Sequence, residues 1–136
     1  MIYLVIPCYN EQEVLEDSTK KLASLIGRMQ GEDMRILFSD DGSRDETWNI
    51  ICKLHHQYPF VEGIRLAHNE GHQKALWAGM EAAADRAEAI ISIDADLQDD
   101  IEVIPRMVAD FRQGADVVYG VRKERDTDSA FKRLTA

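Results

Sequence analysis

Short apolar runs alternate with amphipathic segments along the chain, and this alternation limits the possible folds more than any other feature. Each apolar run has the length of a buried strand, and the segments between them carry apolar residues at helical spacing. The pattern predicts an α/β domain with a mostly parallel sheet and helices on both faces. We expect strands at residues 2–7, 34–39, 60–66, 89–93 and 116–119, and helices at residues 13–29, 43–58, 73–84 and 102–113.

The second expected helix carries its own start signal. Ser43 stands where a cap residue belongs, and Glu46 follows three residues later. This spacing is typical of a capping box, in which the two side chains bind each other's backbone N–H groups. We therefore expect this helix to begin at Ser43 and to end near Tyr58.

Length and composition exclude several classes of protein. The chain has 136 residues, enough for one domain with a core, and a net charge of -9 from 16 basic and 25 acidic residues. The excess of acids argues against nucleic-acid binding, although residues 122–133 form a local basic cluster. The two cysteines indicate no disulfide framework, and no apolar run is long enough to span a membrane. We expect a cytoplasmic protein.

Polar clusters follow the expected strands at the points where those strands end. Right-handed crossovers bring the carboxyl ends of parallel strands to one edge of the sheet, where ligands bind. We therefore expect these clusters to share that edge: residues 9–11, 40–43, 69–71 and 94–100.

The last of these clusters contains the most specific pattern, Asp94-Ala95-Asp96-Leu97-Gln98. In an extended chain alternate side chains point the same way, so the two carboxylates and the amide can converge. A turn at this point would decide which of them reach a common position. Oxygen ligands of this kind suit Mg2+ or Mn2+ held jointly with a substrate diphosphate. The pattern predicts a site for an activated nucleotide.

Two other clusters contain candidate nucleotide ligands. Tyr9 has a ring that can lie against a base, and Glu11 can accept hydrogen bonds from base or ribose; the alternative is a plain turn in which Asn10 caps the next helix. Asp40 and Asp41 precede the expected cap, where adjacent carboxylates are costly unless donors bind them. An acid at this point commonly binds ribose or base in nucleotide-binding sheets, so we favour a functional role for Asp40 and leave Asp41 open.

Three other classes of protein share part of this pattern. A phosphoaspartyl phosphatase uses two aspartates spaced like Asp94 and Asp96, but normally after the first strand of its sheet. A non-catalytic phospho-acceptor signalling domain needs its acidic pair after the first strand, whereas Asp40 and Asp41 follow the second. An NAD-binding domain lacks support, because no Gly-x-Gly-x-x-Gly follows Ile6. The first two classes stay open as alternatives to an enzyme that handles an activated nucleotide.

Taken together, the four clusters resemble the family 2 glycosyltransferases with the GT-A fold. The resemblance is closest to the branch of dolichol-phosphate mannose synthases and bactoprenol-phosphate glucosyltransferases, and it covers essentially the whole chain. The matching motifs, in order along the chain, are Val5-Ile6-Pro7-Cys8-Tyr9-Asn10-Glu11, Asp40-Asp41-Gly42-Ser43 with Asp45 and Thr47, Asn69-Glu70-Gly71 with Ala75 and Gly79, and Asp94-Ala95-Asp96-Leu97-Gln98.

The resemblance implies roles for individual residues. Asp94 and Asp96 would be the catalytic carboxylates, and Arg122 matches a family arginine that meets phosphate groups. It also implies that Pro7, Tyr9 and Glu11 contact the nucleotide and that Asp40 contacts its base. Asp94 and Ala95 would meet the ribose and the diphosphate, and Asp96 and Gln98 would bind a divalent metal.

The resemblance also implies the reaction. We expect metal-dependent, inverting transfer of a hexose from a UDP- or GDP-linked donor to a polyprenyl phosphate or, as the alternative, to a sugar acceptor. Family members continue well beyond residue 136, so we expect residues 1–136 to be a single donor-binding domain at the amino-terminal end of a longer enzyme. Membrane association, at the inner face of the membrane, would come through segments outside this sequence. Exposed sheet edges would favour self-association into a homo-oligomer.

Overall fold

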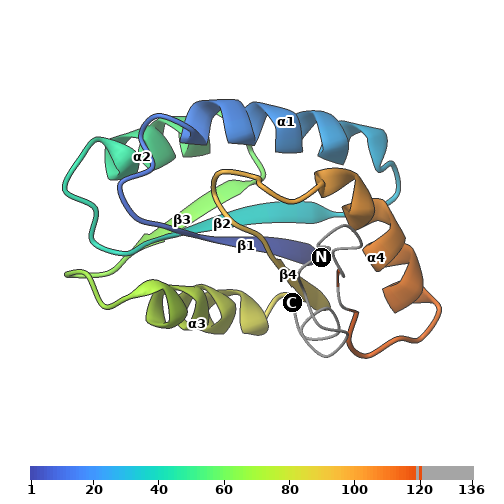
Figure 1. Cartoon of the computed structure of the whole chain (residues 1–136). Helices are drawn as coiled ribbons and strands as arrows, with labels where there is room; N and C mark the ends of the chain where they lie inside the picture. Colours follow the sequence, from blue (N-terminus) through green and yellow to red (C-terminus); the bar gives the residue numbers. More distant parts are fainter. Residues whose placement is uncertain (119, 121–136) are drawn as a thin grey trace, which may run out of the picture. The chain divides into compact units, whose positions relative to one another are not determined.

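A parallel sheet forms the centre of the first of two compact units, Met1–Asp100 and Ile101–Ala136. The computed structural model describes residues 1–118 and residue 120 (Figure 1). The first unit contains β1 (Ile2–Cys8), α1 (Leu15–Arg28), β2 (Met34–Asp40), α2 (Thr47–Gln57), β3 (Val61–Arg65), α3 (His72–Ala84) and β4 (Ala89–Ser92).

The sheet has the order β3-β2-β1-β4, and every neighbouring pair of strands is parallel. Helices α1 and α2 cover one face and α3 covers the other (Figure 1). This arrangement confirms the predicted α/β fold with a mostly parallel sheet. It also brings the carboxyl ends of all four strands to one edge, because each crossover returns the chain to the same starting side.

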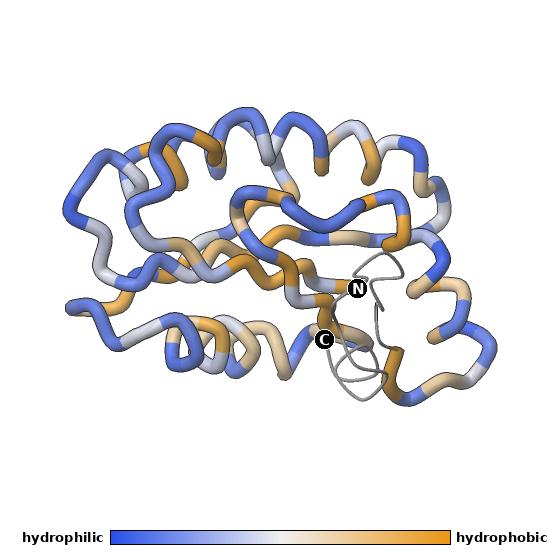
Figure 2. Tube along the Cα trace, in the orientation of Figure 1, coloured by the Kyte–Doolittle hydropathy of each residue, from blue (hydrophilic) through white to orange (hydrophobic). Residues whose placement is uncertain are grey.

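Strand β1 lies at the centre of the core because it is apolar on both faces. All seven of its residues are buried, as a central strand covered by helices on both sides requires. Figure 2 shows the same contrast, with hydrophobic residues along the strands and mainly hydrophilic residues along the exposed side of α1. On the opposite face Gly79 of α3 permits close packing, since a Cβ there would lie 2.6 Å from Val5 Cγ1. The core therefore positions the strand ends rigidly.

The second unit contains a short 3-10 helix, η1 (Ile101–Val103), followed by α4 (Ile104–Arg112). These elements agree with the helix expected at residues 102–113. The strand expected at residues 116–119 is wrong for residues 116–118, which pair with no strand among the described residues, and Tyr119 lies outside them. Val117 is 67% exposed. Two adjacent valines have β propensity, but a strand also needs a neighbour to complete its hydrogen bonds.

The predicted capping box at the start of α2 is wrong. The helix begins at Thr47, its N-cap is Glu46, and no side chain caps it. Ser43 instead donates its hydroxyl to Asp40 Oδ1, because a buried carboxylate competes strongly for nearby donors. Residues 43–46 therefore belong to the loop after β2 and not to the helix.

Within the described part of the chain, no helix has both the length and the apolar character needed to cross a membrane.

Candidate functional site

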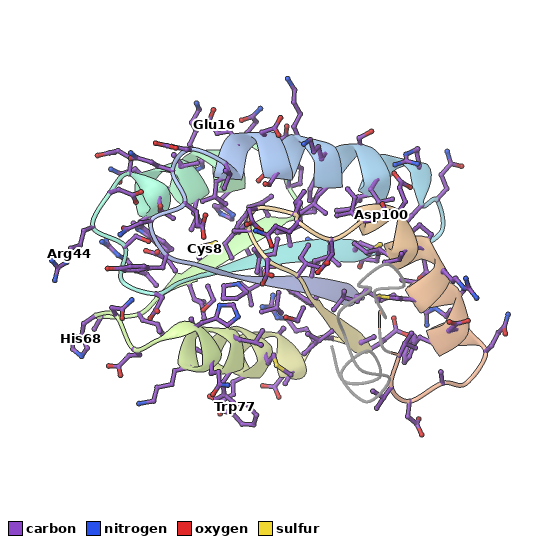
Figure 3. All side chains as sticks on the ribbon, viewed as in Figure 1. Cys8, Glu16, Arg44, His68, Trp77 and Asp100 are labelled. Carbon is purple, nitrogen blue, oxygen red and sulfur yellow. The ribbon has the colours of Figure 1, made fainter. Side chains whose placement is uncertain are left out.

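The loops that follow the four strands lie at one edge of the sheet, as the sequence predicts. Arg44, from the loop after β2, and His68, from the loop after β3, extend at the same end of the sheet (Figure 3). Among the described residues, only Asn10 and Leu97 combine a positive φ with a side chain, at 51° and 50°, and both belong to loops of this edge. Such conformations are uncommon and cluster at functional sites, so they support a site here.

The loops after β1 and β2 are joined by reciprocal hydrogen bonds. Asn10 N donates to Ser43 Oγ at 2.9 Å, and Glu11 N donates to Thr47 Oγ1 at 2.8 Å. In return Arg44 N donates to Asn10 Oδ1 at 3.0 Å. The alternative interpretation of Asn10 as a helix cap is therefore wrong, because its side chain binds the loop after β2 instead of the first turn of α1.

Asp41 connects the loop after β2 to the loop after β3. Its side chain is 2% exposed and accepts hydrogen bonds from Asn69 Nδ2 at 3.0 Å, Glu70 N at 2.7 Å and Gly71 N at 3.0 Å. Beside it, Gly42 has a φ of +68° and packs so closely that a Cβ would lie 2.6 Å from the backbone carbon of His68. The question left open for Asp41 is thus answered by a structural role. We call the contacts of Asp41 with residues 69–71 the Asp41 clamp.

Asp40 differs from its neighbour in having one oxygen without a hydrogen bond. The side chain is completely buried, and its Oδ1 accepts hydrogen bonds from the backbone N–H and the hydroxyl of Ser43. No described residue donates a hydrogen bond to Oδ2, and the nearest cation, Arg65 Nε, lies 3.6 Å away. Buried polar atoms are normally hydrogen-bonded, so a buried carboxylate oxygen that has an ion pair but no hydrogen bond can accept one from a ligand.

The loop after β4 turns sharply where the sequence left the geometry open. Leu97 N donates to the carbonyl of Asp94 at 3.1 Å, which closes a turn. Ala95 is buried, and its carbonyl accepts a hydrogen bond from Ser18 Oγ at 2.6 Å. Asp94, Asp96 and Gln98, in contrast, are exposed, so alternate side chains share the solvent side. Ala95 anchors the loop, and the oxygen-bearing side chains around it are accessible to a ligand.

Negative charge accumulates where the loops after β1 and β4 meet. Burial raises the pKa of the Glu11 carboxyl, and the charges of Asp96, Asp45 and Asp94 raise it further. The three acids belong to the loops after β2 and β4, so their charges act on Glu11 from neighbouring loops of the same edge. A bound cation would relieve their mutual repulsion.

Cys8, at the end of β1, is not a nucleophile. Burial raises the pKa of its thiol well above the ordinary value, and the charges of Glu11 and Asp40 contribute to the rise. Its Sγ donates a weak hydrogen bond to the carbonyl of Ile6 at 3.4 Å. A protonated, enclosed thiol is unreactive, so we assign Cys8 to the core.

The residues at this edge fit a divalent metal shared with a ligand, and not a closed metal site. Among the described residues, no group of at least three His, Cys, Asp or Glu side chains is arranged to hold a metal ion. Asp96 and Gln98 offer only two side chains, both exposed. Mg2+ and Mn2+ commonly bind through one or two protein oxygens together with water and substrate phosphates. The donor set therefore fits such an ion only if a phosphate ligand completes it.

The other predicted site residues differ in accessibility. Pro7 is buried within β1, and Tyr9 is 41% exposed beside it. Arg122 lies outside the described residues. Sequence reasoning missed Arg65, the last residue of β3, whose guanidinium carbon lies 5.7 Å from the centre of the Trp48 ring. The available signal was a cation at the carboxyl end of an expected strand, directly after Ile64.

A cavity of about 570 Å³ lies on the outer side of α1 and α2. Its lining includes Glu16 and Lys53, which form an ion pair at 3.2 Å, together with Leu54 and Tyr58. None of the residues that resemble the family motifs lines this cavity. We therefore assign the candidate site to the edge loops.

Comparison with known proteins identifies the family of this chain. The model of the family described as Glycosyl transferase family 2 matches residues 3–136. All of the chain aligns, at 45% identity, with 42% of an uncharacterized glycosyltransferase of Bacillus subtilis, YkoT. The chain is also 39% identical to a prophage bactoprenol glucosyl transferase homolog of Escherichia coli, with 99% of this chain and 43% of that protein covered.

A third relative is the undecaprenyl-phosphate 4-deoxy-4-formamido-L-arabinose transferase of Pseudomonas fluorescens, which is 38% identical, with 97% of this chain and 38% of that protein covered. The chain thus spans about two fifths of the length of the curated relatives it matches.

Solved structures agree on the fold. The S. aureus protein TarS, residues 1–349, in complex with UDP-GlcNAc superimposes with a TM-score of 0.66 at 19% identity, covering 90% of this chain and 38% of that one. A second structure of TarS residues 1–349 superimposes with a TM-score of 0.63 at 18% identity, covering 93% of this chain and 40% of that one. At this level of identity the likeness shows the fold. With the family model matching nearly every residue, the chain belongs to glycosyl transferase family 2.

Proposed function

We propose that this chain is the donor-binding part of an inverting, metal-dependent hexosyltransferase that uses a nucleotide-sugar and a polyprenyl-phosphate acceptor. The observation that carries the proposal is the convergence of two features at one sheet edge. One is the buried Asp40, whose Oδ2 accepts no hydrogen bond from the described residues and has only the ion pair with Arg65, and the other is the acidic group of Glu11, Asp94 and Asp96. The first suits an N–H of a base, and the second suits a cation bound to a diphosphate.

The loops after β1 and β2 would bind the nucleoside. Tyr9 is exposed enough to lie against a base, and Pro7 holds the strand end behind it. Glu11 would accept a hydrogen bond from base or ribose, and Asp40 Oδ2 would accept one from the base. The reciprocal hydrogen bonds between these loops keep their backbone in place before the donor arrives. Binding then costs little ordering entropy.

The loop after β4 would meet the diphosphate. Asp94 and Ala95 would lie beside the ribose and diphosphate, and Asp96 and Gln98 would hold Mg2+ or Mn2+. When bound, the metal would neutralise the charge that develops on the departing diphosphate. Asp94 and Asp96 are the residues we place closest to the reaction, and their exposure leaves them free to do so.

The acceptor follows from the relatives and from proton chemistry. Two relatives carry bactoprenol or undecaprenyl phosphate in their names. A phosphate acceptor is already ionised near neutral pH, so it attacks the anomeric carbon without a general base. A sugar hydroxyl would need a base, and we assign none of the described carboxylates to that role. Arg122, which would meet phosphate groups, lies outside the described residues.

Calorimetric titration tests the proposal. The chain is titrated with UDP, GDP, UDP-glucose and GDP-mannose, each with and without Mn2+. We expect metal-dependent binding of one nucleotide and its nucleotide-sugar, lost in Asp96→Ala and kept in Asp85→Ala, a matched change at an exposed acid that follows α3 as its C-cap. Absence of binding to all four ligands by a chain that circular dichroism shows to be folded would contradict the proposal.

A further inference from the structure

The two oxygens of Asp40 have different surroundings, which limits what the carboxylate can recognise. Oδ1 already accepts two hydrogen bonds from Ser43. Oδ2 is buried and accepts none from the described residues. Asp40 therefore has one oxygen, and not two, to offer to a ligand.

Arg65 lies directly beside that free oxygen. It is in register with Asp40 across the β2–β3 ladder, so both side chains project from the same face of the sheet. Arg65 Nε lies 3.6 Å from Asp40 Oδ2, which is longer than a hydrogen bond. The guanidinium carbon lies 5.7 Å from the centre of the Trp48 ring. Arg65 and Asp40 thus form an ion pair in which no N–H of Arg65 is hydrogen-bonded to Oδ2.

We propose that Arg65 is a specificity-determining residue that reads the nucleobase together with Asp40 and selects uridine over guanosine. The proposal rests on the proposed function and names the donor class of the same site. Uracil presents one ring N–H between two carbonyl oxygens. Asp40 Oδ2 can accept a hydrogen bond from that N–H, and the adjacent guanidinium of Arg65 can donate one to a neighbouring carbonyl of the base.

Guanine presents a different edge. Its ring N–H and its amino group are adjacent donors, and a carboxylate matches them only when both of its oxygens are free. Here Oδ1 is bound to Ser43, so the amino group of guanine would be left without an acceptor. An unpaired buried donor weakens binding strongly, and this is the source of the selectivity.

Arg65 would also control access to Asp40. The carboxylate is completely buried, whereas the Arg65 side chain is 48% exposed. In the free protein the guanidinium compensates the charge of Asp40. When a uracil enters, the Arg65 side chain turns from Oδ2 toward the base carbonyl, and the ring N–H of the base takes its place beside Oδ2.

The test compares dissociation constants of UDP and GDP, with Mn2+, for the wild-type chain and for Arg65→Met. We expect the wild type to bind UDP at least about tenfold more tightly than GDP, because the amino group of guanine would lack a hydrogen-bond acceptor. Arg65→Met should weaken UDP binding by about tenfold and change GDP binding less than about threefold. Arg44→Met, which removes an exposed cation from a neighbouring loop, should change neither by more than about threefold.

Failure of the inference and failure of the proposed function give different results. A wild-type preference for GDP, or an equal loss of both nucleotides in a folded Arg65→Met chain, overturns the role of Arg65 and leaves the donor site standing. Binding of neither nucleotide overturns the donor site itself. If Arg65→Met does not fold, Arg65→Lys replaces it. That variant keeps the charge without the planar group, and we expect it to lose most of the preference for UDP.

Discussion

Two regions at the same edge of the sheet differ in how far their acidic side chains are buried and hydrogen-bonded. One region is formed by the loops after β2 and β3, and the other is the loop after β4. In the first pair, Asp41 is buried and accepts three hydrogen bonds, and Gly42 packs directly on the next loop. In the loop after β4, Asp94 and Asp96 are exposed, and the anchor is the contact of Ser18 with Ala95. We infer that the base-binding side is organised before a ligand arrives, whereas the diphosphate side is completed by ligand and metal.

The electrostatics differ in the same direction. Asp40 and Asp41 at the end of β2 each have a nearby donor or cation, whereas burial and the charges of Asp96, Asp45 and Asp94 raise the pKa of Glu11. A preorganised pocket lowers the entropic cost of binding, and an unsatisfied acidic group favours the arrival of a cation. We infer that the region after β2 and β3 recognises the base, and that the loop after β4 takes part in neutralising the charge of the diphosphate.

The largest effect on stability should come from the Asp41 clamp. We expect Asp41→Ala to lower the free energy of unfolding by about 3 kcal/mol, because it removes three partly buried hydrogen bonds, each worth about 1 kcal/mol. Urea denaturation of the wild type and the variant measures the difference. A loss below about 1 kcal/mol would mean that the loops are held by other contacts.

Gly42 should be the next most sensitive position. Gly42→Ala places a Cβ against the backbone of His68 and Asn69 and keeps a positive φ, so we expect a loss of about 2 kcal/mol or more. Gly31→Ala is the matched control, because Gly31 also has a positive φ but open space around it. It should cost about 1 kcal/mol. Equal losses in the two variants would show that close packing of the loops contributes nothing.

Ser18 anchors the open loop, and its removal should have a moderate effect. Ser18→Ala deletes the hydrogen bond to the carbonyl of Ala95 and should lower the free energy of unfolding by about 1 kcal/mol. Ser24→Ala, on the exposed side of the same helix, should be neutral. We also expect Ser18→Ala to weaken Mn2+-dependent nucleotide binding, which calorimetry checks. Unchanged binding would argue that Ala95 does not position this loop.

Asp45 should give a small, pH-dependent contribution. Burial alone would raise the pKa of its carboxyl, but hydrogen bonds from the hydroxyl and N–H of Thr47 and from the N–H of Gln12 lower it below the ordinary value. A depressed pKa stabilises the fold at higher pH, and this stability is lost as the pH falls through the folded-state pKa.

The variant Asp45→Asn isolates that contribution. At about pH 7 it should lose no more than about 0.5 kcal/mol, because the group is partly exposed. As the pH falls below the folded-state pKa, the carboxyl becomes protonated in both states and the difference should vanish. Thermal unfolding followed at decreasing pH measures it, and a difference that does not shrink in acid would contradict the assigned cause.

The smallest effect on stability should occur at Asp96. We expect Asp96→Ala to change the free energy of unfolding by less than about 0.5 kcal/mol, because the side chain is exposed. The same variant should abolish metal-dependent nucleotide binding. A marked destabilisation would show that Asp96 stabilises the fold, as Asp41 does, and would contradict the difference proposed between the two residues.

The sequence predicts the fold well because the fold depends on local periodicity. Apolar runs such as Ile2–Cys8 need no knowledge of their neighbours to be recognised as buried strands, and parallel topology then brings the polar loops together. Most residues expected at the site lie in these loops, whereas Pro7 and Asp40 lie at the carboxyl ends of β1 and β2, and Arg122 lies outside the described residues. Their roles as ligands stay predictions.

The sequence did not predict which acid is structural, because that depends on distant partners. Asp40 and Asp41 are adjacent and chemically identical, yet one meets Ser43 and Arg65 while the other meets the loop after β3. The capping box at Ser43 failed for the same reason, since a buried carboxylate from the preceding strand took the hydroxyl. The strand expected at residues 116–119 failed for residues 116–118 because propensity does not supply a partner.

Amide hydrogen exchange tests the central contrast most directly. It is measured by NMR for residues 69–71 and 94–98 in the free chain, and again with UDP and Mn2+. We expect the amides of Glu70 and Gly71, which donate to Asp41, to be protected equally with and without ligand. The amides of Asp96 and Gln98 should become protected only when both UDP and Mn2+ are present, whereas Leu97 N already donates to the carbonyl of Asp94 in the free chain. Protection of Asp96 and Gln98 in the free chain, or protection of Glu70 and Gly71 only after UDP and Mn2+ are added, would contradict the account.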